Sequence, residues 1–156
     1  MEASMQVFPI APANLRSFLL LLLLILIPLI LLAIVLGSSF IGMRYTRFEV
    51  SNSGLRLAGD LYGRTIPAAD LRGGSASLID LKETSELQPT RRTFGTGLPG
   101  YQAGWFRLRN GEKALLYVTD PTRVVYVPTR ADYAVMLSPQ NPEEFLNAIR
   151  AIAPAP

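Results

Sequence analysis

One stretch of nineteen residues, which begins at Phe18 and ends at Leu36, contains no charged side chain and is mostly leucine and isoleucine. As an α-helix, residues 18–36 would be roughly 28 Å long, close to the thickness of the hydrocarbon core of a bilayer. Pro28 lies near its middle, where a membrane helix tolerates proline, and a hairpin turning there would leave two arms too short to cross. Because the chain stays uncharged up to Met43, we predict one transmembrane helix over residues 18–43.

A cleaved secretory signal is the alternative interpretation of this stretch, because Arg16 precedes it as a positive n-region would. The apolar stretch is longer than the usual core of such a signal, and no small-residue cleavage site follows it. We therefore expect an uncleaved anchor, preceded by a short flexible tail over residues 1–17.

The charges that flank the helix indicate its orientation. Arg16 stands on the N-terminal side, whereas Arg44, Arg47 and Arg56 follow on the C-terminal side. Because basic residues favour the cytoplasmic side of a membrane helix, this small excess predicts a single-pass protein of the cell membrane whose larger domain is cytoplasmic.

Residues 44–153 have the mixed composition of one soluble domain, and residues 154–156 form a short tail. Fourteen lysines and arginines stand against eleven acidic residues from Arg44 onward, and the net charge of +3 is spread along the chain. This pattern gives no support to a nucleic-acid partner. The chain contains no cysteine, and a domain without disulfides is compatible with either side of the membrane.

Most of the soluble part alternates apolar and polar residues, which predicts about six to eight antiparallel strands. In the first half, strands are expected at residues 46–50 and 55–57, and residues 60–66 either continue the second of these or form a third. Residues 75–81 and 87–94 could each form a further strand. The expected strands of the second half lie at residues 104–109, 112–119, 124–129 and 133–137. Asn110 and Gly111 suit the two positive φ angles of a type I′ hairpin turn between two of them.

The last segment changes to a helical period. Asn141 is a suitable N-cap, and Pro142 follows it at a first-turn position. Phe145, Ile149 and Ile152 recur at helical spacing, which predicts one apolar face on a C-terminal helix that closes the core.

Four segments together resemble the bacterial pleckstrin-homology-like (PH-like) domain family. They are residues 66–71 (IPAADL), 95–101 (GTGLPGY), 104–108 (GWFRL) and 138–145 (SPQNPEEF). The resemblance covers about residues 45–152. It implies a mainly β fold, with strongly bent antiparallel sheets or a partly open barrel, closed by a C-terminal helix and preceded by the membrane helix.

The sequence offers no catalytic residues, no cofactor site and no metal site. The absence of histidine and cysteine excludes the usual nucleophile–base pairs and the Cys/His zinc sites. Asp60, Asp70, Asp80 and Glu83 could in principle hold a hard cation, but they follow no motif, and we predict that they are solvated surface carboxylates. We therefore expect a protein that is not an enzyme.

The most unusual local stretch is the glycine-rich segment after Arg91 and Arg92. A shaped loop containing Gly97, Gly100 and Tyr101 could bring backbone N–H groups to an anion or a partner. The alternative is a structural corner in which the glycines allow tight packing beneath Trp105. Trp105 and its neighbour Phe106 should face opposite ways on a strand, with core packing as the expected use of the aromatic cluster.

These observations predict a single-pass membrane protein whose PH-like domain is a non-enzymatic module for protein–protein contact or assembly. Its expected partners are the lipid bilayer, through residues 18–36, and a protein that could be a second copy of the chain. The alternative function is binding of an anionic membrane surface. The family implies no single ligand, and the first hairpin carries Arg47 and Arg56 but no basic residue in its turn.

Overall fold

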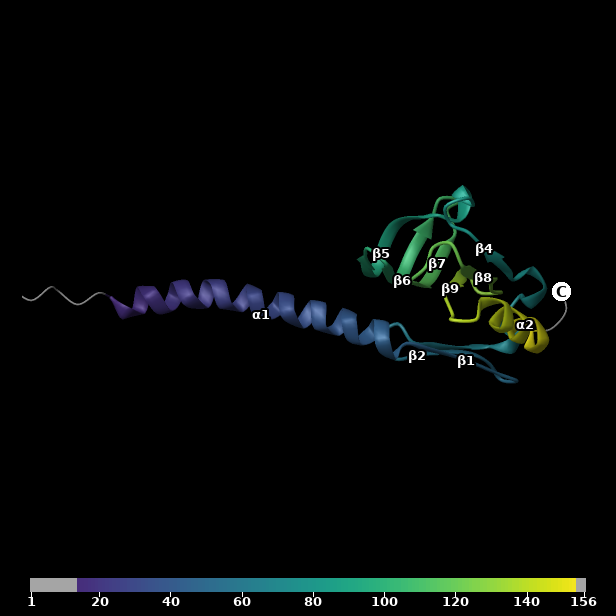
Figure 1. Ribbon diagram of the computed structural model, residues 1–156, viewed down its shortest axis with the longest axis horizontal. Coiled ribbons are helices and arrows are strands. Elements are labelled where there is room, and N and C mark those ends of the chain that lie inside the picture. Colours follow the sequence, from purple (N-terminus) through teal and green to yellow (C-terminus); the bar gives the residue numbers. More distant parts are fainter. Residues whose placement is uncertain (1–13, 154–156) are drawn as a thin grey trace, which may run out of the picture. The chain divides into compact units, whose positions relative to one another are not determined.

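The computed structural model describes residues 14–153, which fall into two compact units divided between Ser38 and Ser39. The tails expected over residues 1–13 and 154–156 lie outside this range. Helix α1 (Leu15–Tyr45) runs through the first unit and ends in the second, which contains nine strands and a second helix, α2 (Pro142–Ile152) (Figure 1). The second unit therefore contains the whole mainly β domain.

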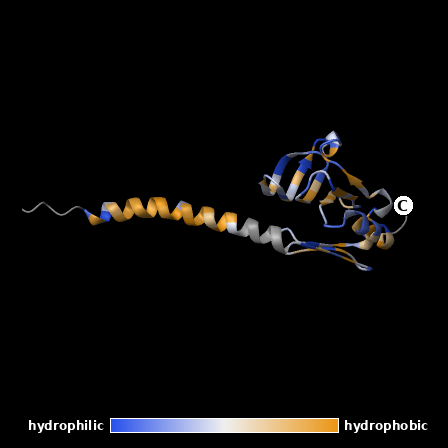
Figure 2. Ribbon diagram, viewed as in Figure 1, coloured by the Kyte–Doolittle hydropathy of each residue, from blue (hydrophilic) through white to orange (hydrophobic). Residues whose placement is uncertain are grey.

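Helix α1 begins three residues before the predicted transmembrane segment and ends two residues after it. Its segment Leu15–Gly37 is long and apolar enough to cross a membrane. Figure 2 shows hydrophobic colouring along most of this segment. Every leucine, isoleucine, valine and phenylalanine side chain between Leu15 and Leu36 is at least 45% exposed. Because no protein core covers these side chains in the part of the chain described, their burial requires another apolar environment.

The strands form two separate sheets that do not close into a barrel. The smaller sheet has the order β1-β2-β3, with β1 (Arg47–Ser51), β2 (Gly54–Ala58) and β3 (Arg64–Pro67). The larger sheet has the order β4-β8-β9-β7-β6-β5. Its strands are β4 (Ser77–Ile79), β5 (Pro89–Leu98), β6 (Tyr101–Leu108), β7 (Lys113–Val118), β8 (Val124–Pro128) and β9 (Ala134–Leu137).

The predicted mainly β fold with a C-terminal helix is confirmed, and one strand pairing differs from the expectation. Strand β9 lies between β7 and β8. It pairs with β7 in the parallel direction and with β8 in the antiparallel direction. Three short 3-10 helices, η1 (Ala68–Asp70), η2 (Gly73–Ser75) and η3 (Ser85–Leu87), connect the early strands. The sheets are therefore mostly rather than wholly antiparallel.

The turn between β6 and β7 is not the predicted type I′ turn. No residue other than glycine has a positive φ among residues 14–153, so Asn110 cannot supply the required angle. Gly111 alone takes the left-handed conformation, at φ 88°, and its N–H bonds to the Leu108 carbonyl at 3.0 Å. The Asn110 side chain instead accepts a hydrogen bond from the Glu112 N–H at 2.9 Å, which stabilises a three-residue turn.

The main core lies between the two sheets and α2. Its fully buried members include Leu55, Leu115, Val135 and Ile149, and Phe145 of α2 joins them. The predicted apolar face of α2 is thus confirmed, although the Asn141 side chain donates to Glu144 at 3.1 Å rather than capping the helix backbone. A second cluster covers the opposite face of the larger sheet.

The two neighbouring aromatic residues of β6 face opposite ways, as the alternation of a strand predicts. Phe106 is buried in the second cluster, whereas Trp105 is half-buried against the main core. This alternation defines an inner face of the larger sheet, toward the main core, and an outer face on which Phe106 lies.

Candidate functional site

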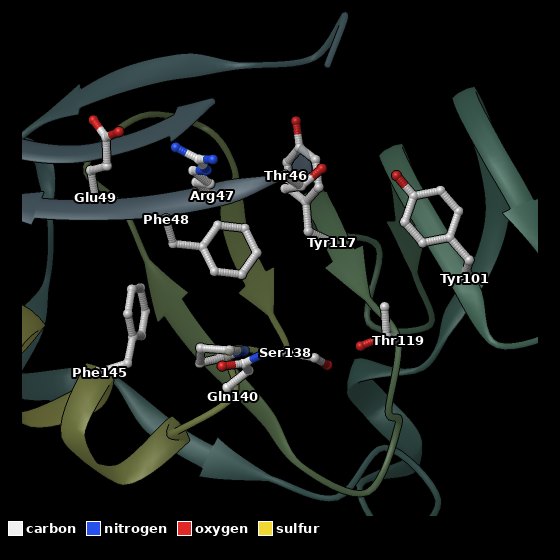
Figure 3. A pocket seen from close by; sticks show the side chains of 11 residues that line it. Thr46, Arg47, Phe48, Glu49, Tyr101, Tyr117, Thr119, Ser138, Gln140 and Phe145 are labelled. Atoms are coloured by element: carbon white, nitrogen blue, oxygen red, sulfur yellow. The ribbon is translucent and has the colours of Figure 1, made fainter. Parts of the chain in front are cut away.

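A cleft of about 620 Å³ opens where β1 separates from the larger sheet. Strand β1 forms one side, and the ends of β6 and β7 form the other, together with the segment that leads into α2 (Figure 3). Its lining residues are Thr46, Arg47, Phe48, Glu49, Tyr101, Tyr117, Thr119, Ser138, Pro139, Gln140 and Phe145. All of them belong to the second unit, so the cleft is a feature of the β domain itself.

Aromatic side chains form the floor of the cleft. Phe48 contacts Tyr117 edge-on, with ring centroids 5.9 Å apart, and contacts Phe145 in the same way at 6.0 Å. Phe48 points toward Phe145, whereas Arg47 and Glu49 point to the other side of β1 (Figure 3). Because side chains alternate along a strand, β1 places its apolar residues on the floor and its charges on the rim.

The edge of β1 that borders the cleft is open. Strand β1 pairs only with β2 within residues 14–153, so alternate N–H and C=O groups on its other side have no strand partner. Such an edge is a template on which another strand can pair. The cleft therefore combines an unpaired backbone edge with an apolar floor.

The wall opposite β1 carries small polar groups. Thr119 and Gln140 are exposed, and Ser138 is half-buried. The Ser138 hydroxyl donates to the Asp120 carbonyl at 3.0 Å, and the Ser138 N–H donates to the Tyr117 carbonyl at 2.9 Å. These bonds fix the segment that leads into α2 against the end of β7, so this wall of the cleft is preformed.

Two buried tyrosines end the cleft near the loop between β2 and β3. The Tyr117 hydroxyl donates to Asp60 Oδ1 at 2.6 Å, and Tyr101 is hydrogen-bonded to Thr46. Burial, as the largest cause, raises the pKa of both phenols, and the nearby Asp60 carboxylate raises it further. Both tyrosines are therefore uncharged hydrogen-bonding groups at physiological pH.

Asp60 differs from the prediction that it is a solvated surface carboxylate. It is half-buried, its Oδ1 also accepts from the Tyr62 N–H at 3.0 Å, and its Oδ2 is buried without a hydrogen-bond partner. Asp70 and Asp80 are also half-buried, and Glu83 is exposed. No group of three metal-ligating side chains gathers within the described part of the chain. Asp60 thus accepts a hydrogen bond from Tyr117, which lines the cleft, and holds this side chain in place.

The predicted glycine-rich loop is a strand pair in the structure. Its residues form the end of β5, the start of β6 and the turn at Pro99 and Gly100, with Gly97 paired to Gln102. Cross-strand pairing with β6 therefore uses the backbone groups on one side of this part of β5, and the other side belongs to the open edge of the larger sheet. Gly100 has φ 76° in the exposed turn, which explains why glycine stands there.

The five predicted site residues divide between two places. Arg91, Arg92, Gly97 and Gly100 are exposed on the hairpin of β5 and β6, and the Arg92 side chain lies over Gly97. Tyr101 is 4% exposed and lines the cleft. The structure therefore separates the arginines from the tyrosine with which they were grouped.

Close backbone contact, rather than a corner beneath Trp105, explains two glycines of this hairpin. Gly95 and Gly104 face each other across β5 and β6. A Cβ atom on Gly104 would lie 2.5 Å from the Phe94 carbonyl oxygen, and its φ is 110°. Only glycine allows the two strands to approach this closely.

Sequence reasoning missed most of the cleft. Phe48 alternates as any core residue does, and Thr119 stands outside every segment that resembles the family. Ser138 and Gln140 lie in the segment 138–145, but that resemblance gave them no binding role. The cleft arises because strands distant in sequence separate at this point, and such a separation leaves no local signal. Of its lining residues, only Tyr101 was among the predicted site residues.

Comparison with known proteins gives a family match over most of the chain. A family model described as a bacterial PH domain matches residues 43–152. No curated protein and no solved structure matches the chain. The matched range covers all nine strands and helix α2.

Proposed function

Because this chain belongs to the bacterial PH domain family, we propose that it is a membrane-anchored binding module whose cleft receives an extended segment of a partner protein. Domains of this fold generally bind lipids, peptides or proteins rather than catalyse reactions, and we propose the same non-enzymatic role here. The partner contributes a strand, which pairs with β1. A second copy of the chain is one protein that could supply it.

The open edge of β1 inside the cleft is the observation that carries this proposal. An extended peptide that pairs with such an edge gains main-chain hydrogen bonds, and alternate side chains provide specificity in the pockets beneath. Here the pocket beneath the edge is the floor formed by Phe48, Tyr117 and Phe145. We expect the bound segment to place a large apolar side chain on that floor.

The edge of β5 supports this choice by contrast. Strand β5 is also open on one side, but two irregularities interrupt its pairing with β6, one between Pro89 and Arg91 and one between Arg92 and Phe94. Bulges and exposed charges are the features with which proteins prevent edge-to-edge pairing. The exposed Arg91 and Arg92 stand between these bulges. Strand β1 also carries exposed charges, Arg47 and Glu49, but it pairs with β2 in a regular register without a bulge.

The test uses full-length protein in nanodiscs and a displayed library of unstructured peptides, from which binders are selected. Gln140→Trp places a large ring at the mouth of the cleft, and Asn147→Trp is the matched control on an exposed position of α2 that does not line it. We expect Gln140→Trp to weaken the selected peptides at least about tenfold, which corresponds to roughly 1.4 kcal/mol. Equal affinity for both variants would contradict binding in the cleft.

We also propose that α1 anchors the protein as a single pass, with the β domain in the cytoplasm. The length and exposed apolar surface of α1 support the anchor, and the arginines that follow it support the orientation. Protease treatment of sealed and permeabilised cells, followed with an antibody to the β domain, tests this topology. Cleavage only after the inner membrane opens is the expected result, and cleavage with that membrane intact would reverse the orientation.

A further inference from the structure

Two of the residues that line the cleft, Arg47 and Glu49, carry a charge. Both belong to β1, one on each side of Phe48, and both are exposed. The two tyrosines of the cleft are uncharged at physiological pH, and the other lining residues have no ionisable side chain. Any preference of the cleft for charge in its partner therefore comes from β1.

The two charges of β1 differ in what faces them across the smaller sheet. Glu49 is directly opposite Arg56 of β2, and a nitrogen of the Arg56 guanidinium lies 3.6 Å from the Glu49 carboxylate. Arg47 is directly opposite Ala58, and no carboxylate among residues 14–153 forms an ion pair with it. The charge of Glu49 is thus balanced within the domain, whereas the charge of Arg47 is not.

A strand that pairs with the free side of β1 would bring its own side chains next to these charges. Because side chains alternate along a strand, the residue that rests on the floor beside Phe48 has two neighbours that point to the other side of the sheet. Arg47 and Glu49 point to that side as well (Figure 3). One neighbour therefore lies next to Arg47 and the other next to Glu49, whether the segment runs parallel or antiparallel to β1.

We propose that Arg47 selects partner segments in which an acidic residue stands next to the large apolar residue that occupies the floor. This inference rests on the proposed function, since it names the chemistry of the segment that the cleft receives. A carboxylate beside Arg47 provides the opposite charge that β2 lacks, and such cross-strand pairs stabilise a sheet. A lysine or arginine at the same place would be repelled by Arg47.

The neighbour that lies next to Glu49 is less restricted. A basic residue there would approach the Arg56 cation as well as the Glu49 carboxylate, so attraction and repulsion partly cancel. The ligand class is therefore an extended segment with one acidic position beside an apolar anchor. A segment with strictly alternating charges is not required.

The first test compares the peptides that are selected on three full-length proteins in nanodiscs. They are the wild type, Arg47→Glu and the control Arg130→Glu, which makes the same change of charge at an exposed position outside the cleft. With the wild type and the control, we expect enrichment of Asp and Glu at one of the two positions beside the apolar anchor. With Arg47→Glu, Lys and Arg should be enriched at that position instead.

The second test measures the coupling between Arg47 and the acidic residue of one selected peptide. That residue is changed to glutamine in the peptide, Arg47→Gln is made in the protein, and the dissociation constant is measured for all four combinations. With the wild-type protein, the peptide change should weaken binding about two- to fivefold, the range of a cross-strand pair of opposite charges. With Arg47→Gln, the same peptide change should leave the dissociation constant unchanged.

The results separate this inference from the proposed function. If Gln140→Trp weakens the selected peptides but they show no acidic preference, or keep it with Arg47→Glu, the cleft binds peptides and Arg47 does not select them. Equal effects of the glutamine peptide on wild-type and Arg47→Gln protein would also overturn the selection. If Gln140→Trp and Asn147→Trp bind the peptides equally well, or if the library yields no binder, both the proposed function and the role of Arg47 are contradicted.

Discussion

Among the four edge strands of the two sheets, β1, β3, β4 and β5, strands β1 and β5 differ in the regularity of their edges. Strand β5 has ten residues, and bulges and adjacent arginines interrupt its regular edge. Strand β1 has five residues, a regular register with β2, and an aromatic floor beside its free side. Because bulges interrupt β5 and do not interrupt β1, we infer that β1 is the edge that accepts a partner strand.

The cleft beside β1 and the sheet face near β5 are two surfaces of different chemistry on one domain. The cleft beside β1 offers a backbone edge and uncharged aromatic groups, which suit an extended protein segment. The inner face near β5 carries the exposed cations Arg91 and Arg107 and the exposed Phe94 ring. Substitutions can therefore change one surface without the other.

The largest expected effect on stability comes from a substitution that separates β5 from β6. Gly104→Val would place a branched side chain against the Phe94 carbonyl oxygen in a backbone conformation that disfavours it. We expect a loss of about 3 kcal/mol or more in the free energy of unfolding, measured by denaturant titration. Gly111→Ala is the control, because no atom lies within 4 Å of its Cβ position, and about 1 kcal/mol is expected there.

Gly104→Val should disrupt the β5 edge, and neither Gly104 nor its partner Gly95 lines the cleft. Equal destabilisation by both glycine substitutions would mean that close packing does not hold β5 in place.

Alkaline pH should weaken the cleft end of the domain. The pKa values of Tyr101 and Tyr117 are raised above 10.0 in the folded state, so above pH 10 the unfolded chain loses these phenolic protons first. The folded state then binds more protons, and stability falls as pH rises, by about 1.4 kcal/mol per pH unit for each tyrosine. Unfolding titrations between pH 8 and pH 11 measure the slope.

The variant Tyr117→Phe should reduce this alkaline slope, because it removes one of the three phenols whose pKa is raised, the others being Tyr101 and Tyr126. A slope that is the same in the wild type and in the variant would rule out Tyr117 as its source.

At neutral pH, the same Tyr117→Phe substitution should have a moderate effect on stability. It removes the 2.6 Å bond to Asp60 and leaves a half-buried carboxylate with one partner fewer. We expect a loss of about 1–3 kcal/mol in thermal or denaturant unfolding. Tyr133→Phe is a suitable comparison, because its contacts are with the Trp105 ring and the Arg64 guanidinium. An unchanged free energy of unfolding for Tyr117→Phe would contradict a stabilising role for this hydrogen bond.

The smallest effect on stability should come from substitutions of the exposed arginines on the edge strand β5. Arg91→Val and Arg92→Val together remove exposed charges, so we expect a change within about 0.5 kcal/mol in the free energy of unfolding. Without these charges, β5 should pair with other copies, and light scattering should show concentration-dependent association. Substitution of the two exposed residues Arg123 and Arg130 by valine is the control. A monodisperse β5 variant would mean that the bulges alone protect the edge.

The sequence predicted those parts of the fold that repeat a local pattern. The apolar span, the hairpin of β1 and β2 and the apolar face of α2 follow from hydrophobic period, turn residues and first-turn chemistry. The turn at Asn110 was predicted with the wrong type, because the Asn110 side chain bonds to Glu112 and fixes an alternative backbone conformation.

The site was less predictable because distant segments build it. Phe48, Tyr117 and Phe145 meet only after the two sheets and α2 have packed together. The glycine-rich hairpin attracted attention because glycines mark special backbone, but Gly95 and Gly104 serve strand packing. Composition alone also concealed the row of Arg91, Arg107 and Lys113, which only the strand register brings together.

Residue-resolved amide hydrogen exchange of the full-length protein in nanodiscs, with and without a peptide selected for binding, tests the central claim most directly. Strand addition at the cleft predicts slower exchange for the outward-facing amides of β1 when the peptide is present, with unchanged exchange in β5. Slower exchange in β5 with no change in β1 would contradict the account and make the arginine-bearing edge the binding edge.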